Sequence, residues 1–172
     1  FYCLRTTHSV CRRNRICSNG AAGISIGERD TNHLIEHNVI ASNSAQGVLF
    51  RRPVVDGGNY VIVRGNTFSD NGRARDNTQI LIESGTHAVH VVHNRFESPA
   101  GPTIRVGDHC TQIAIQGNTQ QAQPLSDDAI ESASHVIDPR HAELPAVGPA
   151  ELDTCGARHL GIPLLAPWTA SR

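Results

Sequence analysis

Short segments in which apolar and polar residues alternate recur along the first two thirds of the chain. One set comprises residues 23–27, 47–51, 79–83 and 103–107. Alternation with a period of two is typical of a strand with one buried face. A second set of alternating segments ends on an asparagine, and a brief third apolar segment follows. The pattern predicts short strands separated by turns.

The asparagines recur in phase with this pattern, at Asn14, Asn38, Asn66, Asn94 and Asn118. Successive spacings are 24 or 28 residues, which is too long for a heptad and fits one turn of a solenoid. Stacked coils would place each asparagine on its equivalent, where side-chain amides can bond to one another and to turn backbone. An antiparallel sandwich also has short strands and turns, but it does not explain the phase of the asparagines.

Stacking would also bury each inward side chain on its equivalents in neighbouring coils. We expect four inward rows, all of small, β-branched or aromatic residues. They are Ile24/Val48/Ile80/Ile104, Ile26/Phe50/Ile82/Val106, Cys11/Ile35/Val63/Val91/Ile115 and Ile16/Ile40/Phe68/Phe96.

The repeat Ile-x-x-Asn-x-Phe followed by Gly-Ile-x-Ile resembles the parallel β-helix repeat of pectate-lyase-like proteins, over about residues 9–118. The resemblance implies an all-β, right-handed parallel β-helix of about four to five coils; the right hand agrees with the general rule for such connections. That superfamily includes polysaccharide lyases, glycoside hydrolases, epimerases, phage tailspikes and noncatalytic surface proteins. The resemblance thus indicates an architecture more than an activity.

The chain divides into coils over residues 1–122 and a Pro-rich remainder over residues 123–172, predicted to be a degenerate coil and a capping tail. Leu164, Leu165 and Trp168 are the expected anchors of the tail. Because methionine is absent and the repeat starts by Ser9, we expect coils to be missing at the N-terminal side. The open first coil would then be a surface for self-association.

The net charge of −1 and the pI near 6.9 give no global attraction to nucleic acid or to anionic membranes, and no apolar run is long enough to span a bilayer. The five cysteines have no zinc-finger spacing, and their odd count mildly favours an oxidising compartment. Cys110 with Cys155 would tether the tail. The expected location is secreted, periplasmic or at the cell surface.

Candidate chemistry lies on the outward side of the first set of strands, where proteins of this resemblance commonly bind polysaccharide. Arg51, Glu83 and Arg105 are the candidate catalytic residues, with Arg51 and Glu83 as immediate neighbours. Arginines pair well with uronate carboxylates and can stabilise charge that develops during proton removal. Candidate substrate-binding residues, on the strand ends and the longest loop, are Arg52, Arg73, Arg75, Asp76 and Asp108.

Two functions remain open at this point. The first is a secreted carbohydrate-active protein that binds a polysaccharide, for which an acidic one is favoured, and that cleaves it as a lyase or a glycoside hydrolase. The second is a noncatalytic glycan-binding or structural β-helix of a surface protein. No metal-ligand set is predicted from the sequence. Lyases of similar fold use calcium, for which Asp56, Asp70 and Asp76 are oxygen donors without diagnostic spacing. For every outward residue, a solvated salt-bridged surface is the simpler interpretation.

Overall fold

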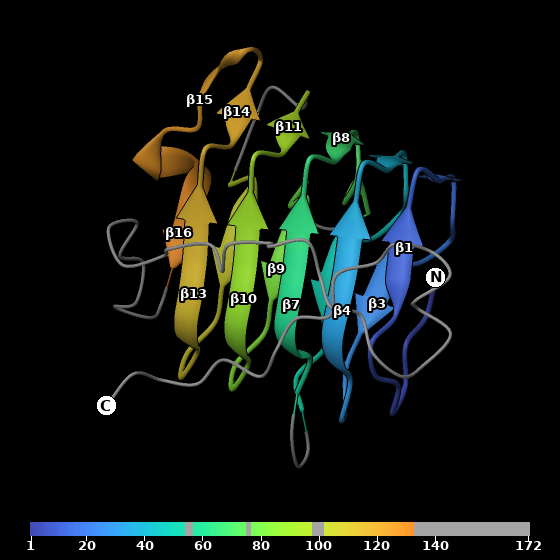
Figure 1. Cartoon of the computed structure of the whole chain (residues 1–172). Coiled ribbons are helices and arrows are strands. Elements are labelled where there is room, and N and C mark those ends of the chain that lie inside the picture. Colours follow the sequence, from blue (N-terminus) through green and yellow to red (C-terminus); the bar gives the residue numbers. More distant parts are fainter. Residues whose placement is uncertain (54–56, 75–76, 98–101, 133–172) are drawn as a thin grey trace, which may run out of the picture.

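The computed structural model describes residues 1–53, 57–74, 77–97 and 102–132, which form a stack of coils with three sheets (Figure 1). All pairings between strands are parallel except the one at the end of the third sheet. Sheet A contains β3 (Ile24–Ile26), β6 (Val48–Phe50), β9 (Ile80–Ile82), β12 (Ile104–Val106) and β16 (Ile130–Ser132). Sheet B contains β1 (Val10–Arg12), β4 (Thr31–Glu36), β7 (Asn59–Arg64), β10 (His87–Val92) and β13 (Thr111–Gln116). Sheet C contains β2 (Arg15–Cys17), β5 (Val39–Ala41), β8 (Thr67–Ser69), β11 (Arg95–Phe96), β14 (Thr119–Gln120) and β15 (Gln123–Pro124).

The register confirms the predicted solenoid. In sheet A, Ile24 pairs with Val48, Val48 with Ile80, and Ile80 with Ile104. The predicted inward rows form one continuous core in which Phe50, Phe68 and Phe96 are fully buried, with Ile16 at its edge. The rings of Phe68 and Phe96 are stacked, with centroids 5.1 Å apart. Each coil therefore buries its inward face only by lying on its neighbours.

The predicted asparagines form a ladder at the corner between sheets B and C, which we call the first ladder (Asn14, Asn38, Asn66, Asn94 and Asn118). The Oδ1 atom of Asn66 accepts hydrogen bonds from the backbone N–H and the Nδ2 of Asn38, both at 2.9 Å. The Nδ2 of Asn66 donates to Oδ1 of Asn94 and to the carbonyl oxygen of Ile35, both at 3.0 Å. The same four contacts repeat at Asn38 and Asn94. Buried amides are thus satisfied from coil to coil.

A second ladder, which the sequence analysis missed, follows sheet C. Asn19 donates to Asn43, and Asn43 donates to Asn71, each through Nδ2 at 2.7 Å from the acceptor Oδ1. Asn71 then donates to Oε1 of Gln79 at 2.8 Å, so a glutamine from the following turn ends the ladder. Asn19, Asn43 and Asn71 have the same spacings of 24 and 28 as the first ladder.

Two exposed histidines, His37 and His93, occupy the left-handed corner just before the first ladder, each with φ of +53°. The equivalent residues in the coils that follow them are Gly65 and Gly117, also at positive φ. A Cβ atom at Gly65 would lie 2.8 Å from the His37 ring, and one at Gly117 would overlap the His93 ring. Each imidazole therefore packs against a glycine of the following coil, and Gly65 separates the coil of His37 from the coil of His93.

The outer side of sheet B carries an ion-paired carboxylate. Glu36 is buried between Arg12 and Arg64, and both guanidinium groups approach its oxygens at 2.8 Å. Burial by itself would raise the pKa of Glu36, but the hydrogen bonds and charges of Arg64 and Arg12 outweigh it and lower that pKa. Glu36 therefore ties three successive coils together as a carboxylate.

Gly58 lies at the corner between sheets A and B, where the neighbouring core leaves no room for a side chain. A Cβ atom there would lie 2.6 Å from Ile26 and 3.2 Å from Phe50. The N–H of Asn59 donates to the carbonyl oxygen of Gly57 at 3.0 Å, so the chain turns tightly at Gly58. Close packing onto the core is the reason that glycine is needed at Gly58.

Candidate functional site

The outer face of sheet A, defined by the outward residues of β3, β6, β9, β12 and β16, carries most of the predicted site. The strand register aligns its central row, which consists of Ser25, Leu49, Leu81, Arg105 and Glu131. Ser25 is buried, Leu49 and Leu81 are half-buried, and Glu131 is exposed. The face thus has an apolar middle with polar groups toward its C-terminal end.

Arg51, predicted to be catalytic, turns toward the first coil. Its guanidinium donates to Oγ of Ser25 and to the carbonyl oxygen of Cys3, both at 2.6 Å. It also lies 4.1 Å from the ring centroid of Tyr2 and 3.9 Å from Oδ2 of Asp30. The side chain covers Gly27, where a Cβ atom would overlap the guanidinium. These contacts give Arg51 a structural role as a clamp between three coils.

Glu83 lies beside Arg51 along the backbone, because the N–H of Glu83 donates to the carbonyl oxygen of Phe50 at 3.1 Å. The two side chains nevertheless have different partners. Oε2 of Glu83 accepts a hydrogen bond from the backbone N–H of Arg52 at 3.2 Å, while the Arg52 side chain is exposed. The expected neighbours are therefore adjacent strand positions whose charged groups point to separate contacts.

Arg105, the third predicted catalytic residue, is paired with an acidic residue that the sequence analysis did not place. Its Nε lies 2.8 Å from Oε2 of Glu131 on β16, and the strand register sets these two residues opposite each other. The repeat is degenerate beyond residue 122, which hid Glu131 as the next member of the row. Arg105 is thus bound to a neighbouring coil at the C-terminal end of the face.

The remaining predicted binding residues lie at the margins of sheet A. Asp108 is exposed beyond the end of β12. Arg73 pairs with Asp70 at 3.1 Å, and both side chains are more than half exposed. Arg75 and Asp76 lie outside the described residues, as do Asp56 and Cys155. The structure therefore places Arg52, Glu83 and Asp108 on accessible parts of the face without gathering all predicted residues into one cluster.

Three buried ligand-type side chains meet inside the first two coils, and the sequence analysis did not bring them together. Potential ligand atoms of Cys3, Asp30 and His33 all lie within 4.8 Å of one another. Burial raises the pKa of Cys3 and lowers that of His33, which favours a neutral thiol and a neutral imidazole. A set of one sulfur, one nitrogen and one oxygen does not suit calcium, which prefers oxygen ligands.

The hydrogen bonds of this cluster also differ from those of a ligated histidine. Nδ1 of His33 accepts from the backbone N–H of Ser9 at 3.1 Å, so the neutral ring carries its proton on Nε2. Nε2 is buried without a hydrogen-bond partner among the described residues. Metal-bound imidazoles instead donate their second N–H to an acceptor. Asp30 already accepts from Thr6 and from the N–H of Gly27, so it serves the corner of the coil.

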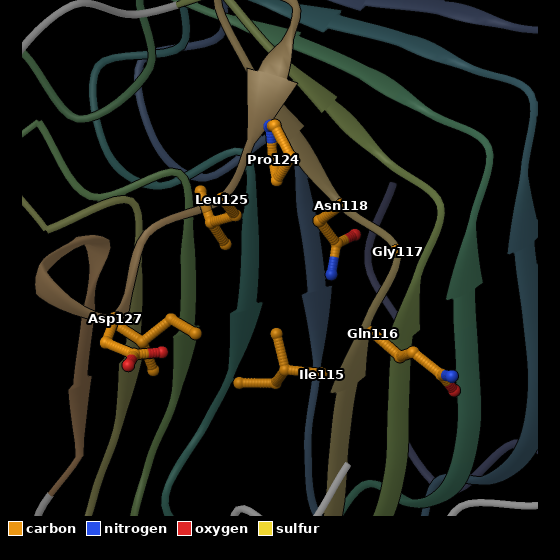
Figure 2. Close-up of a pocket in the computed structure, with 8 residues that line it drawn as sticks. Ile115, Gln116, Gly117, Asn118, Pro124, Leu125 and Asp127 are labelled. Carbon is orange, nitrogen blue, oxygen red and sulfur yellow. The ribbon is translucent and has the colours of Figure 1, made fainter.

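A hollow of about 590 Å³ opens inside the last coil. Figure 2 shows Ile115, Asn118, Pro124 and Leu125 around it, with Asp127 of the 3-10 turn η1 (Asp127–Ala129) at one side. Ile115 belongs to an inward row, and Asn118 is the last residue of the first ladder. The hollow therefore lies at the C-terminal end of the described part of the core, separate from the outward residues predicted to bind a ligand.

The parallel coils, the inward rows and the asparagine ladder define the protein as a parallel β-solenoid. A family model described as a right handed beta helix region matches residues 1–122, so the chain belongs to the right-handed β-helix family. Comparisons with curated proteins and with solved structures gave no match. Within the described part of the chain, no helix is long and apolar enough to cross a membrane.

Proposed function

We propose that this β-helix binds an acidic polysaccharide along the outer face of sheet A, as a glycan-binding protein. The observation that carries the proposal is the exposed side chain of Arg52, which follows the end of β6, on a face where Leu49 of β6 and Leu81 of β9 are paired and half-buried. A regular row of outward residues with an apolar middle and a cation at its margin suits a sugar polymer whose rings present apolar faces and whose carboxylates pair with arginine.

Binding without cleavage is favoured because two of the three predicted catalytic residues have internal partners. Arg51 is bound to Ser25 and Cys3, and Arg105 is bound to Glu131. A guanidinium held by protein acceptors has to lose those bonds before it can act on a substrate. This cost makes Arg51 and Arg105 poor candidates for proton transfer in the arrangement described.

The test is binding of polygalacturonate, measured by calorimetry, with a neutral polysaccharide of similar length for comparison. Arg52→Ala should weaken binding by about fivefold, which corresponds to roughly 1 kcal/mol for an exposed ion pair. Arg95→Ala is the matched control, because Arg95 is an exposed arginine on sheet C. Equal loss in both variants, or equal binding of the neutral polymer, would refute a specific face on sheet A.

Cleavage of the bound polymer is the second candidate, and the position of Glu83 favours it. Its carboxylate accepts from the backbone of Arg52 at the middle of the same face, where it would meet a bound sugar. Formation of ultraviolet-absorbing unsaturated ends would indicate a lyase, and formation of reducing ends alone would indicate a hydrolase. Either product should disappear in Glu83→Gln, and binding with neither product would leave the noncatalytic function.

A further inference from the structure

Tyr2 extends the central outward row of sheet A by one coil. An isolated parallel bridge pairs Tyr2 with Ser25, the member of that row on β3. The carbonyl oxygen of Phe1 accepts from the N–H of Ser25 at 2.9 Å, and the N–H of Cys3 donates to the carbonyl oxygen of Ser25 at 2.8 Å. Cys3 is buried, so alternation along the strand directs the side chain of Tyr2 outward. The row therefore begins with an aromatic ring, one coil before Ser25 and two coils before Leu49.

The guanidinium of Arg51 fixes the orientation of this ring. Its carbon atom lies 4.1 Å from the ring centroid of Tyr2, which is a cation–π contact. The same guanidinium donates to Oγ of Ser25 and to the carbonyl oxygen of Cys3, both at 2.6 Å. Both acceptors flank Tyr2, because Ser25 pairs with it and Cys3 follows it in the chain. The cation is therefore held against one face of the ring.

The remainder of the ring is open to solvent. Tyr2 is 66% exposed, which is the largest value among the exposed large apolar side chains of the described residues. Because Arg51 covers one face, the exposed area lies on the other face and at the hydroxyl edge. An exposed side chain usually loses rotamer freedom when it binds a ligand, and this loss weakens binding. A ring that Arg51 already holds in place loses less.

We propose that Tyr2 is an aromatic subsite for the polysaccharide, in which the open face of its ring packs against one sugar ring, and that Arg51 is its positioning residue. This inference rests on the proposed binding of an acidic polysaccharide to the outer face of sheet A, and it adds a contact that requires no charge. Tyrosine suits this contact because it combines a flat apolar surface with a hydroxyl group that can bond to sugar hydroxyls. Arg51 serves the ligand through Tyr2 while it keeps its own acceptors.

The position of Tyr2 is compatible with a carboxylate contact at Arg52 on the same face. Tyr2 lies two coils before Leu49, and Arg52 follows the strand that carries Leu49. At about 4.8 Å between coils, the two levels are roughly 10 Å apart along the stack. One polymer chain that follows the outward row can therefore contact Tyr2 with a ring and Arg52 with a carboxylate.

The experiment measures binding of polygalacturonate to the full 172-residue chain by calorimetry, at low and at high salt. Tyr2→Ala should weaken binding about fivefold, whereas Tyr2→Phe, which keeps the ring, should bind nearly as the wild type does. The loss in Tyr2→Ala should persist at high salt, while the loss in Arg52→Ala should shrink because salt screens exposed charges. Tyr60→Ala is the matched control and should bind like the wild type, because Tyr60 is the other tyrosine of the chain and lies on sheet B.

Arg51 is tested by a double-mutant cycle, because it also holds neighbouring coils together. Arg51→Met should weaken binding when Tyr2 is present and should have no further effect in Tyr2→Ala. A loss of equal size in both backgrounds would overturn the positioning role, since a purely structural effect does not depend on the ring. If Arg51→Met fails to fold, Tyr2→Ala and Tyr2→Phe still test the subsite, because the Tyr2 side chain is exposed.

The outcomes separate the aromatic subsite from the proposed function. If Arg52→Ala weakens binding but Tyr2→Ala binds like the wild type, the subsite is overturned and binding on sheet A stands. A loss in Tyr2→Ala that shrinks with salt as much as the loss in Arg52→Ala would also overturn the subsite, because the contact would then be ionic. An equal loss in Tyr60→Ala would do the same. A wild-type chain that does not bind polygalacturonate would overturn both proposals.

Discussion

Replacing Asn66 with alanine removes the central rung of the first ladder. The side chain of Asn66 is 1% exposed and makes four hydrogen bonds, two as acceptor from Asn38 and two as donor to Ile35 and Asn94. In Asn66→Ala the buried N–H of Asn38 and the carbonyl oxygen of Ile35 each lose a partner. At about 1–3 kcal/mol for each of these two groups, the loss of stability should be about 2–6 kcal/mol. A typical domain has only about 5–15 kcal/mol in total.

Asn14→Ala is the matched control, because Asn14 is the exposed end of the same ladder. Its Nδ2 donates to Oδ1 of Asn38, but that oxygen also accepts from the backbone N–H of Asn14, which the substitution keeps. The loss here should be about 1 kcal/mol or less. The assay is guanidinium unfolding followed by circular dichroism, with a second probe to check that the coils unfold together. Equal losses in the two variants would refute the ladder as a source of stability.

Three further predictions concern other contacts between coils. Stability should fall in acid as the pH drops through the lowered pKa that Glu36 has in the folded protein. The reason is that a carboxylate with a lowered pKa stabilises the fold only while it is ionised. Glu36→Gln should flatten this pH dependence of the unfolding midpoint. Gly117→Ala should lower the midpoint through overlap with the His93 ring and a φ of +62°, and His93→Ala added to it should restore only the steric part. Leu4→Lys should reduce self-association in sedimentation, because Phe1 and Leu4 are about half exposed on the first coil.

Each of these predictions has a distinct refutation. If the unfolding midpoint fell at low pH in Glu36→Gln as it does in the wild type, the ion pairs of Glu36 with Arg12 and Arg64 would not be a source of stability. Full recovery of Gly117→Ala by His93→Ala would show that the positive φ costs nothing there. A wild-type chain that stays monomeric at high concentration would refute association through the first coil.

Most of the fold could be predicted because stacking repeats one set of requirements in every coil. Inward residues must be apolar at every level, and a buried corner amide needs an equivalent above and below it, so both leave a periodic trace in the sequence. The second ladder has the same trace at Asn19, Asn43 and Asn71, and it could have been found from the same spacings. Its end at Gln79 could not, because that glutamine lies out of phase and reaches the ladder through its longer side chain.

The candidate site was less predictable because side-chain direction is not periodic. Alternation places Arg51 on the outer face of sheet A, but the acceptors that hold it, the carbonyl oxygen of Cys3 and the hydroxyl of Ser25, depend on how a long side chain crosses Gly27. Arg105 was placed correctly on the strand, yet its partner Glu131 lies in a coil whose sequence has lost the repeat. Charged residues on one face are thus predictable in position and unpredictable in pairing.

Coils of 24 and 28 residues stack in the same register, so the length of such a chain can vary without a change in the pairing of its strands. The four extra residues of the longer coils fall in the connections before β7 and before β9, outside the strands and the first ladder. Loops can therefore grow on the flanks while hydrogen bonding between levels stays the same. A duplication or deletion of one whole coil would present the same amide to the next level, so the molecule is built to be lengthened or shortened by recombination in complete turns.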